Sequence, residues 1–488
     1  MPVPSTPAPW INTPVKSADL SRKLVRSASG SRKESGMRHF RLLVTVLALV
    51  AAACASVGPS ASAIDRINHI VVIYQENWSF DGLFGNFPGA NGLANAGDTV
   101  RQTDKDGRPY ATLPASIDNR KRPPAPDVRI PAELPVAPFN LGLYVRTEDT
   151  AGNPIHRFYH QQYQINGGKM DRFIPWSGVG GLVMSYYDAT DLPIGRLAQE
   201  YVLADNFFHA AFGGSFLNHV WLVCACTPYW PVAPAAMRAQ VDANGLIVKD
   251  GDVTPDGYVV NTAYTVNVPH PEGTAPSSLL PNLTQPTIGD RLDEKGISWA
   301  WYSGGWREAL AGRPHANFQF HHQPFAYFAK WADGTAAKAQ HLKDEDDFLR
   351  DLEGGTLPAV SFVKPLGPDN EHPGYASLLR GQEHVAALVR AIMMNRAWDE
   401  TAIIITYDEN GGRWDHVPPP QVDRWGPGVR VPTIVISPFA RRRYVDHTYY
   451  DTTSILKLIE RRWSLPPLGP RDAAANDLSN AFDSSARR

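Results

Sequence analysis

The sequence predicts an α/β protein with a doubly wound, mostly parallel sheet that is flanked by helices. Short apolar runs rich in β-branched residues alternate along the chain with amphipathic segments, an order typical of parallel sheets. We expect strands at 67–74, 202–206, 297–302, 358–363, 401–406 and 433–437. Helices are expected at 192–201, 288–294, 382–395 and 452–463. Since no repeat or linker divides residues 64–488, we expect them to form a single domain.

Polar side chains directly follow two of these strands. The run 401–406 has the length and composition of an interior parallel strand, and Asp408 and Glu409 come after it. Glu76 and Asn77 follow the run 67–74 in the same way. Ligands bind beyond the carboxyl ends of the strands in open α/β sheets, so the four side chains would share one cation if the strands are parallel neighbours. A solvated acidic turn is the alternative for the later stretch considered alone.

A glycine pair precedes Ser215 in the segment AFGGSFLNH. Glycines let the backbone turn tightly and expose a hydroxyl at a helix start, where backbone amides favour an anion. The alternative is a serine that only caps the helix. The segment is not a G-x-S-x-G elbow, so acyl transfer is not the first hypothesis.

Several histidines lie in loops between these elements. His156 and His160 have the i, i+4 spacing of a metal pair on one helix face, although half-exposed aromatic packing explains them equally. His321 and His322 lie in an aromatic loop, and His372 follows the strand at 358–363. Two loop-rich segments, 86–150 and 228–287, are expected to form a surface excursion or lid and a β-hairpin insertion over the site.

The start of the chain has the composition of an export signal. Residues 1–36 lack periodicity and are interpreted as a disordered or non-native extension, with Met37 as the true start. Residues 37–63 combine a basic start, an apolar run and an A-S-A cleavage pattern, which predicts a signal peptide and a periplasmic or extracellular protein. An uncleaved anchor and a lipoprotein attached through Cys54 are the alternatives.

The remaining composition excludes some functions. A formal net charge of −2 gives no argument for nucleic acid, and no stable protein partner is implied. Cys224 and Cys226 are two residues apart, which on a strand is a strained spacing for a disulfide. We interpret both as buried small apolar residues, which export would allow but not require to be oxidised.

Five ordered motifs together resemble the bacterial phosphoesterase family that joins secreted phospholipases C to acid phosphatases, within the alkaline-phosphatase-like superfamily. They are HIVVIYQENWSFDGLFG, NGGKMDRF, DNFFHAAFGGSFLNH, YDENGGRWDHVPPP and GPGVRVPTIVISPF, and the resemblance covers roughly residues 64–465. It implies an alkaline-phosphatase-like fold with long insertions over the site and a catalytic domain at 64–488.

The resemblance also implies roles for single residues. Ser215 is expected to be the nucleophile and a metal-bridging hydroxyl. The expected metal ligands are Glu76, Asn77, Asp408 and Glu409. Histidines expected to line the phosphate pocket are His156, His321, His322 and His372. Three further candidates, taken from the motifs, are Lys169, Asp415 and His416, and the role of His416 is open.

The chemistry of these side chains is consistent with the resemblance. Carboxylate, amide and hydroxyl oxygens suit Ca²⁺, Mg²⁺ or Mn²⁺, and a cation beside a serine oxygen stabilises its alkoxide. We expect Ser215 to form a phosphoserine while a protonated histidine, with His372 as the first choice, donates to the leaving oxygen. Histidines near their ordinary pKa would be charged in acid, so an acid pH optimum is expected.

The branch of the family decides the substrate. The segment GGSFLNH and the absence of room for further C-terminal β-domains favour an acid phosphatase that acts on small phosphomonoesters. The main alternative is a phospholipase C-type phosphodiesterase that cleaves phosphatidylcholine-like lipids. A non-catalytic surface protein that binds metal and phosphate is the alternative from another class.

Overall fold

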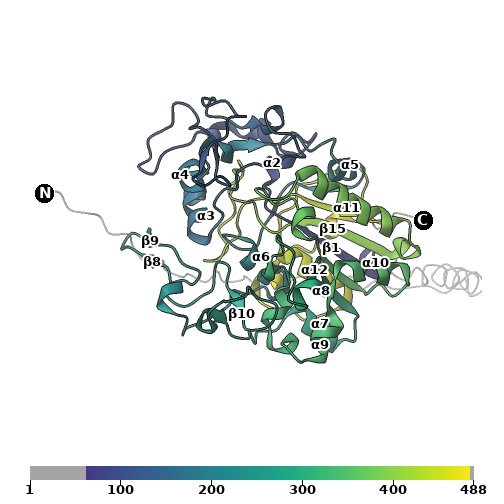
Figure 1. Ribbon diagram of the computed structural model, residues 1–488. Coiled ribbons are helices and arrows are strands. Elements are labelled where there is room, and N and C mark those ends of the chain that lie inside the picture. The colour runs from purple at the N-terminus through teal and green to yellow at the C-terminus, as the bar shows by residue number, and fades with distance from the viewer. Residues whose placement is uncertain (1–61, 484–488) are drawn as a thin grey trace, which may run out of the picture. The chain divides into compact units, whose positions relative to one another are not determined.

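An eight-stranded mixed sheet organises residues 62–483, the part of the chain that this computed structural model describes (Figure 1). The order of the strands is β13-β12-β14-β1-β15-β16-β6-β17. Their bounds are β13 Leu342–Asp344, β12 Trp299–Ser303, β14 Val360–Lys364, β1 His69–Gln75, β15 Thr401–Tyr407, β16 Thr433–Ile436, β6 Val202–Ala204 and β17 Tyr444–Asp446. Strand β16 is antiparallel to both of its neighbours, and every other pairing is parallel.

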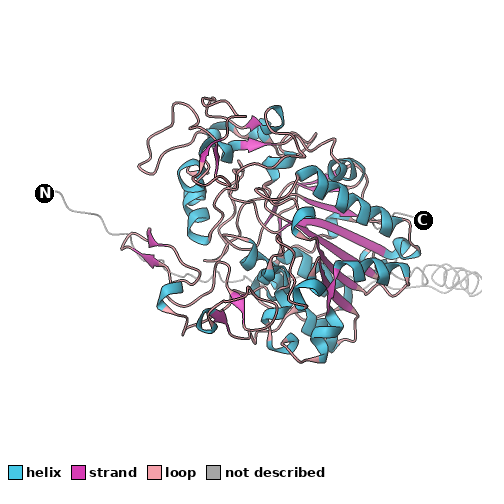
Figure 2. Ribbon diagram, in the orientation of Figure 1, coloured by secondary structure: helices cyan, strands magenta, loops and turns pink. Residues whose placement is uncertain are grey.

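Helices lie on both sides of this sheet (Figure 2). Helix α11, Leu378–Met393, packs against α5, Pro193–Glu200, whereas α6, Ser215–Cys224, packs against α12, Thr453–Trp463, and α7, Ile288–Glu294. Because both faces are covered, all residues of β14 and β15 are buried. The remaining α-helices of the described residues are α2 Phe80–Phe84, α3 Phe158–Ile165, α4 Phe173–Ser177, α8 Trp306–Leu310, α9 Ala336–His341, α10 Glu345–Glu353 and α13 Pro470–Ala474.

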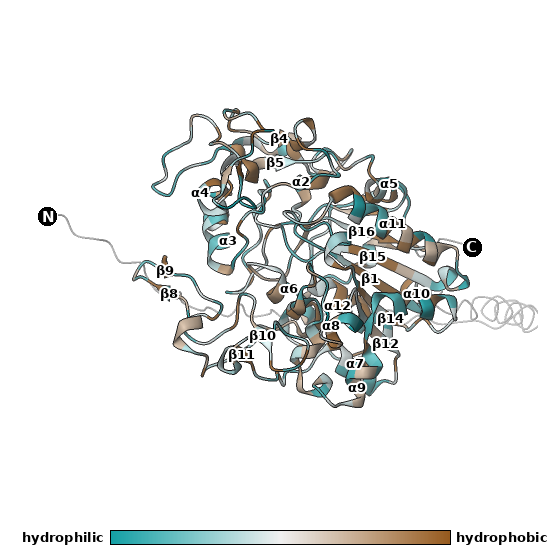
Figure 3. Cartoon of the chain, viewed as in Figure 1, coloured by the Kyte–Doolittle hydropathy of each residue, from teal (hydrophilic) through white to brown (hydrophobic). Residues whose placement is uncertain are grey.

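Hydropathy follows this layering (Figure 3). Apolar residues fill the central strands, while α10 is mostly hydrophilic; its Phe348 and Leu352 are buried toward the sheet, and Leu349 is exposed. The predicted α/β class with a mostly parallel sheet is therefore confirmed. The six predicted strands and four predicted helices are all present, and the edge strands β13 and β17 are additional.

The two loop-rich segments carry short strands. Segment 86–150 contains β2, Ile117–Asp118, paired with β3, Ala125–Pro126, and also β4, Phe139–Asn140, which pairs with β5, Ser185–Tyr186. Segment 228–287 contains the expected hairpin, β8 Gln240–Val241 with β9 Ile247–Lys249, and a parallel pair, β10 Tyr264–Thr265 with β11 Leu279–Leu280. Strands β7, Phe207–Phe208, and β18, Tyr450–Asp451, form the remaining pair.

The cysteine prediction is wrong. Cys224 is the last residue of α6 rather than part of a strand, and Ala225 turns the backbone with a φ of 48°. The turn brings the Cα atoms of Cys224 and Cys226 to 5.2 Å, and the two sulfurs form a disulfide.

Some predictions fall beyond the described residues. The extension 1–36, the signal peptide up to residue 61 and Cys54 all lie outside them. Within 62–483, none of the helices has both the length and the apolar character needed to cross a membrane.

The turn after β15 contains a glycine, Gly411, at which we expect a substitution to lower the stability of the fold. Gly411 has a φ of 62°, and a Cβ there would lie 2.3 Å from the backbone oxygen of Asn77. Gly296 has a similar φ of 65°, but nothing lies within 4 Å of its Cβ position. We expect Gly411→Ala to lower the free energy of unfolding by about 1–3 kcal/mol more than Gly296→Ala does. Denaturant unfolding measures both, and equal losses would contradict the close contact.

Candidate functional site

The register of β1 and β15 brings the acidic residues together. The two strands are parallel neighbours, as predicted, and Gln75 lies opposite Tyr407. Glu76 and Asp408 therefore follow at the same edge of the sheet. The backbone N–H of Asn77 donates to Asp408 Oδ1 at 3.0 Å, which joins the two strand ends.

Ser215 is the first residue of α6, and this helix begins at the same edge of the sheet. Gly213, with a φ of 94°, passes so close to Phe158 that a Cβ would lie 2.7 Å from its nitrogen. Gly214 holds the N-cap position, so the alternative of Ser215 as a helix cap is wrong. The Ser215 Oγ lies 3.2 Å from Glu76 Oε2 and 3.4 Å from Asn77 Oδ1. The hydroxyl lines a cavity of about 410 Å³.

Two histidines face Asn77 across this cavity. The Asn77 Nδ2 donates to His156 Nε2 at 3.3 Å and to His372 Nε2 at 3.2 Å. Their Nδ1 atoms lie 2.7 and 2.6 Å from the carbonyl oxygens of Pro154 and Pro373, so each ring carries its proton on Nδ1.

Burial keeps these imidazoles neutral. It lowers the pKa of His156 to about 4, with a further contribution from the neighbouring His372. Burial also lowers the pKa of His372. The premise that the pocket histidines titrate near their ordinary pKa is therefore wrong, and the acid optimum loses the support it took from that premise.

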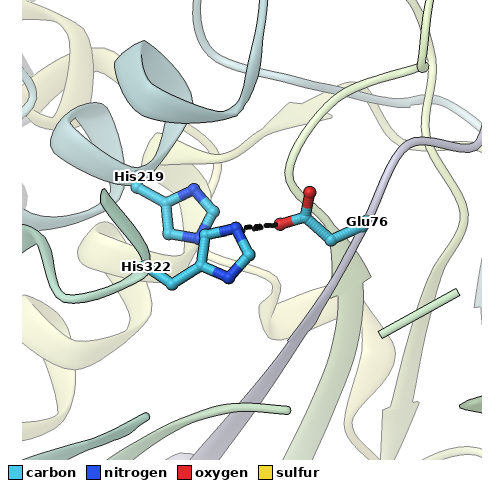
Figure 4. A group of neighbouring side chains, drawn as sticks. All are labelled: Glu76, His219 and His322. Atoms are coloured by element: carbon cyan, nitrogen blue, oxygen red, sulfur yellow. Dashed lines mark ion pairs between the residues drawn. The ribbon is translucent and has the colours of Figure 1, made fainter. Parts of the chain in front are cut away.

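Glu76 is the centre of a second group of side chains (Figure 4). His322 Nε2 lies 3.0 Å from Glu76 Oε1, and the His219 ring stacks on His322 at 4.9 Å between centroids. Lys364 contacts the same oxygen and donates to the carbonyl oxygen of Tyr74 at 2.9 Å. Burial opposes ionisation of Glu76, but Lys364, His322 and His219 together outweigh it and hold the carboxyl pKa well below its usual range. His321 lies edge-on to His322.

Lys364 and His219, which both lie beside Glu76, were not among the predicted site residues. Lys364 is the only charged residue of β14, and a lysine inside an apolar run is a usable signal of a buried ion pair. His219 is four residues after Ser215 on the same helix, and its Nδ1 lies 2.7 Å from the Ser215 carbonyl oxygen.

Asp408 and Glu409 lack compensating charge. Burial raises the pKa of each carboxyl well above its usual range, and neighbouring carboxylates add to the effect. Asp408 Oδ2 and Glu409 Oε1 are buried and have no hydrogen-bond partner between residues 62 and 483. Glu76, His219 and His322 also offer ligand atoms that lie within 4.8 Å of one another. Unpaired buried oxygens beside surplus negative charge fit a divalent cation.

Asp415 and His416 belong to a different cluster. Asp81 accepts from the backbone N–H of His416 at 2.7 Å and lies 2.6 Å from its Nδ1. The spacing of these three residues would suit a metal, but the buried Arg430 guanidinium already donates to Asp415 at 2.9 Å and to Asp81 at 3.1 Å. We interpret this cluster as a structural ion-pair network, because the arginine supplies the positive charge.

Two other candidates lie away from Ser215. Lys169 is exposed and does not line the cavity. His160 lies within α3 and packs against Trp176 at 5.8 Å between ring centroids, whereas His156 precedes the helix. The pair therefore does not share a helix face, and the metal hypothesis for it is wrong.

Two relatives of this chain are named phospholipase C. The chain is 27% identical over 464 residues to phospholipase C A of Mycobacterium tuberculosis strain H37Rv, covering 87% of this chain and 79% of that protein. It is 24% identical to the non-hemolytic phospholipase C of Pseudomonas aeruginosa strain PAO1, covering 86% of this chain and 57% of the relative.

Among solved structures, the chain is similar to an alkaline phosphatase superfamily protein from Vibrio parahaemolyticus. The identity is 12%, the match covers 66% of this chain and 72% of that one, and the TM-score is 0.32, so the fold class rests on the sheet itself. The model of the phosphoesterase family matches residues 67–466. This match spans most of the sequence, and the chain belongs to the phosphoesterase family.

Proposed function

We propose that the chain is a phospholipase C-type phosphodiesterase with Ser215 as its nucleophile. The relatives named above support this alternative over the acid phosphatase that we expected first. The expectation of a phosphatase rested partly on chain length. This chain spans 79% of a relative named phospholipase C, so its length is no argument against that activity.

The charge of the cavity carries the proposal. Among the described residues that line it, Arg157 is the only arginine or lysine. Its guanidinium contacts Asp250 and donates to Asp252 at 3.0 Å and to the Gly251 carbonyl oxygen at 3.2 Å. A phosphomonoester dianion needs more positive charge than a diester monoanion does. A lining whose one fixed cation is already paired therefore favours the diester.

The metal would be held by the oxygens at the strand ends. Glu76, Asn77, Asp408 and Glu409 are the proposed ligands, with Ser215 Oγ beside them, and Ca²⁺, Mg²⁺ or Mn²⁺ suits such a set. When bound, the cation supplies positive charge that stabilises the serine alkoxide and the charge on the phosphoryl oxygens.

The chain's own residues provide positioning and proton transfer. Ser215 attacks phosphorus, the bond to the lipid alcohol breaks, and water later releases the phosphorylated headgroup from the serine. Nε2 of His372 or His156 is the atom that exchanges protons with the leaving oxygen and with water, because Nδ1 of each ring is held by a carbonyl. Asn77 orients both rings.

Export is part of the same proposal. A basic start, an apolar run and a small-residue cleavage pattern at 37–63 support a periplasmic or extracellular location, with attachment through Cys54 as the alternative. A phospholipid is the partner that fits this location and the names of the relatives.

The activity test compares a diester with a monoester. We expect the metal-loaded protein to hydrolyse p-nitrophenyl phosphodiesters with a higher kcat/KM than p-nitrophenyl phosphate between about pH 5 and 9. Ser215→Ala should lower kcat at least about 10³-fold because no nucleophile remains. Ser277→Ala, at an exposed position outside the cavity, is the matched control.

Two results would contradict the proposal. Faster turnover of the monoester would restore the acid phosphatase hypothesis. Undiminished turnover by Ser215→Ala would remove the serine mechanism, whichever substrate is preferred.

Metal binding predicts an unusual stability change for Asp408→Asn. In the metal-free protein the pKa of Asp408 lies above the usual 3.8, so the folded state binds a proton more tightly than the unfolded chain. That contribution to stability is present at low pH and is lost as the pH rises through the folded pKa. We therefore expect the variant to have a higher Tm than the metal-free wild type at about pH 8, and the difference to shrink toward about pH 5.

The same variant should respond less to metal. We expect the rise in Tm with added Ca²⁺, Mg²⁺ or Mn²⁺ to be much smaller for Asp408→Asn than for the wild type. The control is Asp399→Asn, which changes an exposed carboxylate. A lower Tm for metal-free Asp408→Asn, or an unchanged response to all three metals, would contradict the assignment of Asp408 as a ligand.

A further inference from the structure

We propose that the cavity recognises a polyhydroxylated headgroup, such as glycerol, a sugar or inositol, rather than a quaternary ammonium group. This inference rests on the proposed diester activity, because the headgroup remains on the phosphate that Ser215 attacks. The observation behind it is a set of uncharged polar groups that line the cavity without partners in the described part of the chain. They come from three separate segments of the chain.

The first group is the side-chain amide of Asn153. Asn119 holds the Asn153 backbone by donating to its carbonyl oxygen at 2.7 Å and accepting from its N–H at 2.9 Å. The Asn153 side chain packs against Gly374, two residues from His372. Its Oδ1 atom is buried and has no hydrogen-bond partner, although both asparagines line the cavity. The Asn153 side-chain amide therefore lies near His372 with no hydrogen-bond partner among the described residues.

The second group is the hydroxyl of Thr262. Asn261 accepts from the Phe158 backbone N–H at 3.1 Å and donates to the Gly251 carbonyl oxygen at 2.7 Å. These bonds fix the segment beside the cavity, and Thr262 lines it. None of the described residues forms a hydrogen bond with the Thr262 hydroxyl. Asn119 and Asn261 have the same function here. Each forms hydrogen bonds with the backbone, and a residue of the same segment of the cavity wall, Asn153 or Thr262, keeps its polar side chain unpaired among the described residues.

The third group is the amide of Gln319, on the loop that leads to His321. Gln319 lines the cavity, and its side chain forms no hydrogen bond with any residue between 62 and 483. Together, two amides and one hydroxyl offer both donors and acceptors. Alcohol hydroxyls also donate and accept, so a polyol can pair with all three groups.

A trimethylammonium group would find no matching surface. Among the described residues that line the cavity, Tyr375 is the only phenylalanine, tyrosine or tryptophan, and the His372 ring stacks on it at 4.3 Å between centroids. Glu76 is the only carboxylate among these lining residues, and Lys364 already contacts it. Recognition of quaternary ammonium uses open aromatic faces, and this cation would leave the three polar groups unpaired.

The test uses four p-nitrophenyl phosphodiesters whose second alcohol is methanol, choline, glycerol or inositol. We expect the metal-loaded wild type to hydrolyse the glycerol or inositol diester with a kcat/KM at least about tenfold above those of the methyl and choline diesters. A choline diester that equals or exceeds both polyol diesters would overturn the headgroup inference. A methyl diester that matches the polyol diesters would also overturn it.

Failure of the proposed function gives a different result. If none of the four diesters is hydrolysed while p-nitrophenyl phosphate is, the diester activity itself fails and this inference fails with it. Turnover of the methyl diester with no polyol preference leaves the diester activity standing and removes only the headgroup inference.

Single variants locate the preference. We expect Gln319→Leu and Thr262→Val each to reduce the ratio of polyol to methyl kcat/KM about three- to tenfold, because a hydroxyl then lacks one partner. Gln421→Leu, at an exposed position outside this cavity, should keep the wild-type ratio. Because the methyl diester is measured in the same protein, a general loss of folding changes both rates and leaves the ratio unchanged. Wild-type ratios in both cavity variants would overturn the inference.

Discussion

Three buried carboxylates facing one buried lysine are the constraint on which the site depends. Glu76 is ionised beside Lys364, whereas Asp408 and Glu409 are placed in the same interior without a cation of their own. Burying several carboxylates together costs free energy. They cannot move apart, because the pairing of β1 with β15 fixes the strand ends that carry them. The sheet thus holds Asp408 and Glu409 where their ionised forms have no lysine or arginine partner among the described residues, an arrangement that is compatible with a divalent cation.

Neutral side chains complete the site around that charge. Ser215 and Asn77 carry no charge, and burial lowers the pKa values of the histidines that face them. A substrate anion would therefore be attracted mainly to the strand ends, where the metal would lie, and much less to the other walls of the cavity. In the proposed mechanism, the attraction would then act mainly on the phosphoryl group, and the remaining walls of the cavity could select the substrate by hydrogen bonding.

Much of this could be predicted because strand ends and glycine-serine turns are local signals. Glu76, Asp408 and Ser215 were found from their positions beside such elements. Contacts between separate segments have no comparable local signal. The motif that contains Asp415 and His416 was a candidate for the site, but the hydrogen bond from Arg430 to Asp415 makes it part of a structural ion-pair network. The spacing of Cys224 and Cys226 was judged as if both lay on a strand, because an apolar run alone does not distinguish a buried helix from a strand. That error also concealed the disulfide, since only a tight turn brings the two sulfurs together.

The choice between phosphatase and phospholipase shows which observations bear on a substrate. Chain length is a property of the whole protein and not of the cavity. It therefore gives no information on how much negative charge of a substrate the cavity can neutralise. The pairing of Arg157 with Asp250 and Asp252 does, because it removes the cation that a dianion would need. Once that charge is absent, hydrogen bonds have to supply the remaining selectivity. In our proposal, the amides of Asn153 and Gln319 and the Thr262 hydroxyl, which have no side-chain partner among the described residues, supply those hydrogen bonds to the alcohol that the phosphate carries.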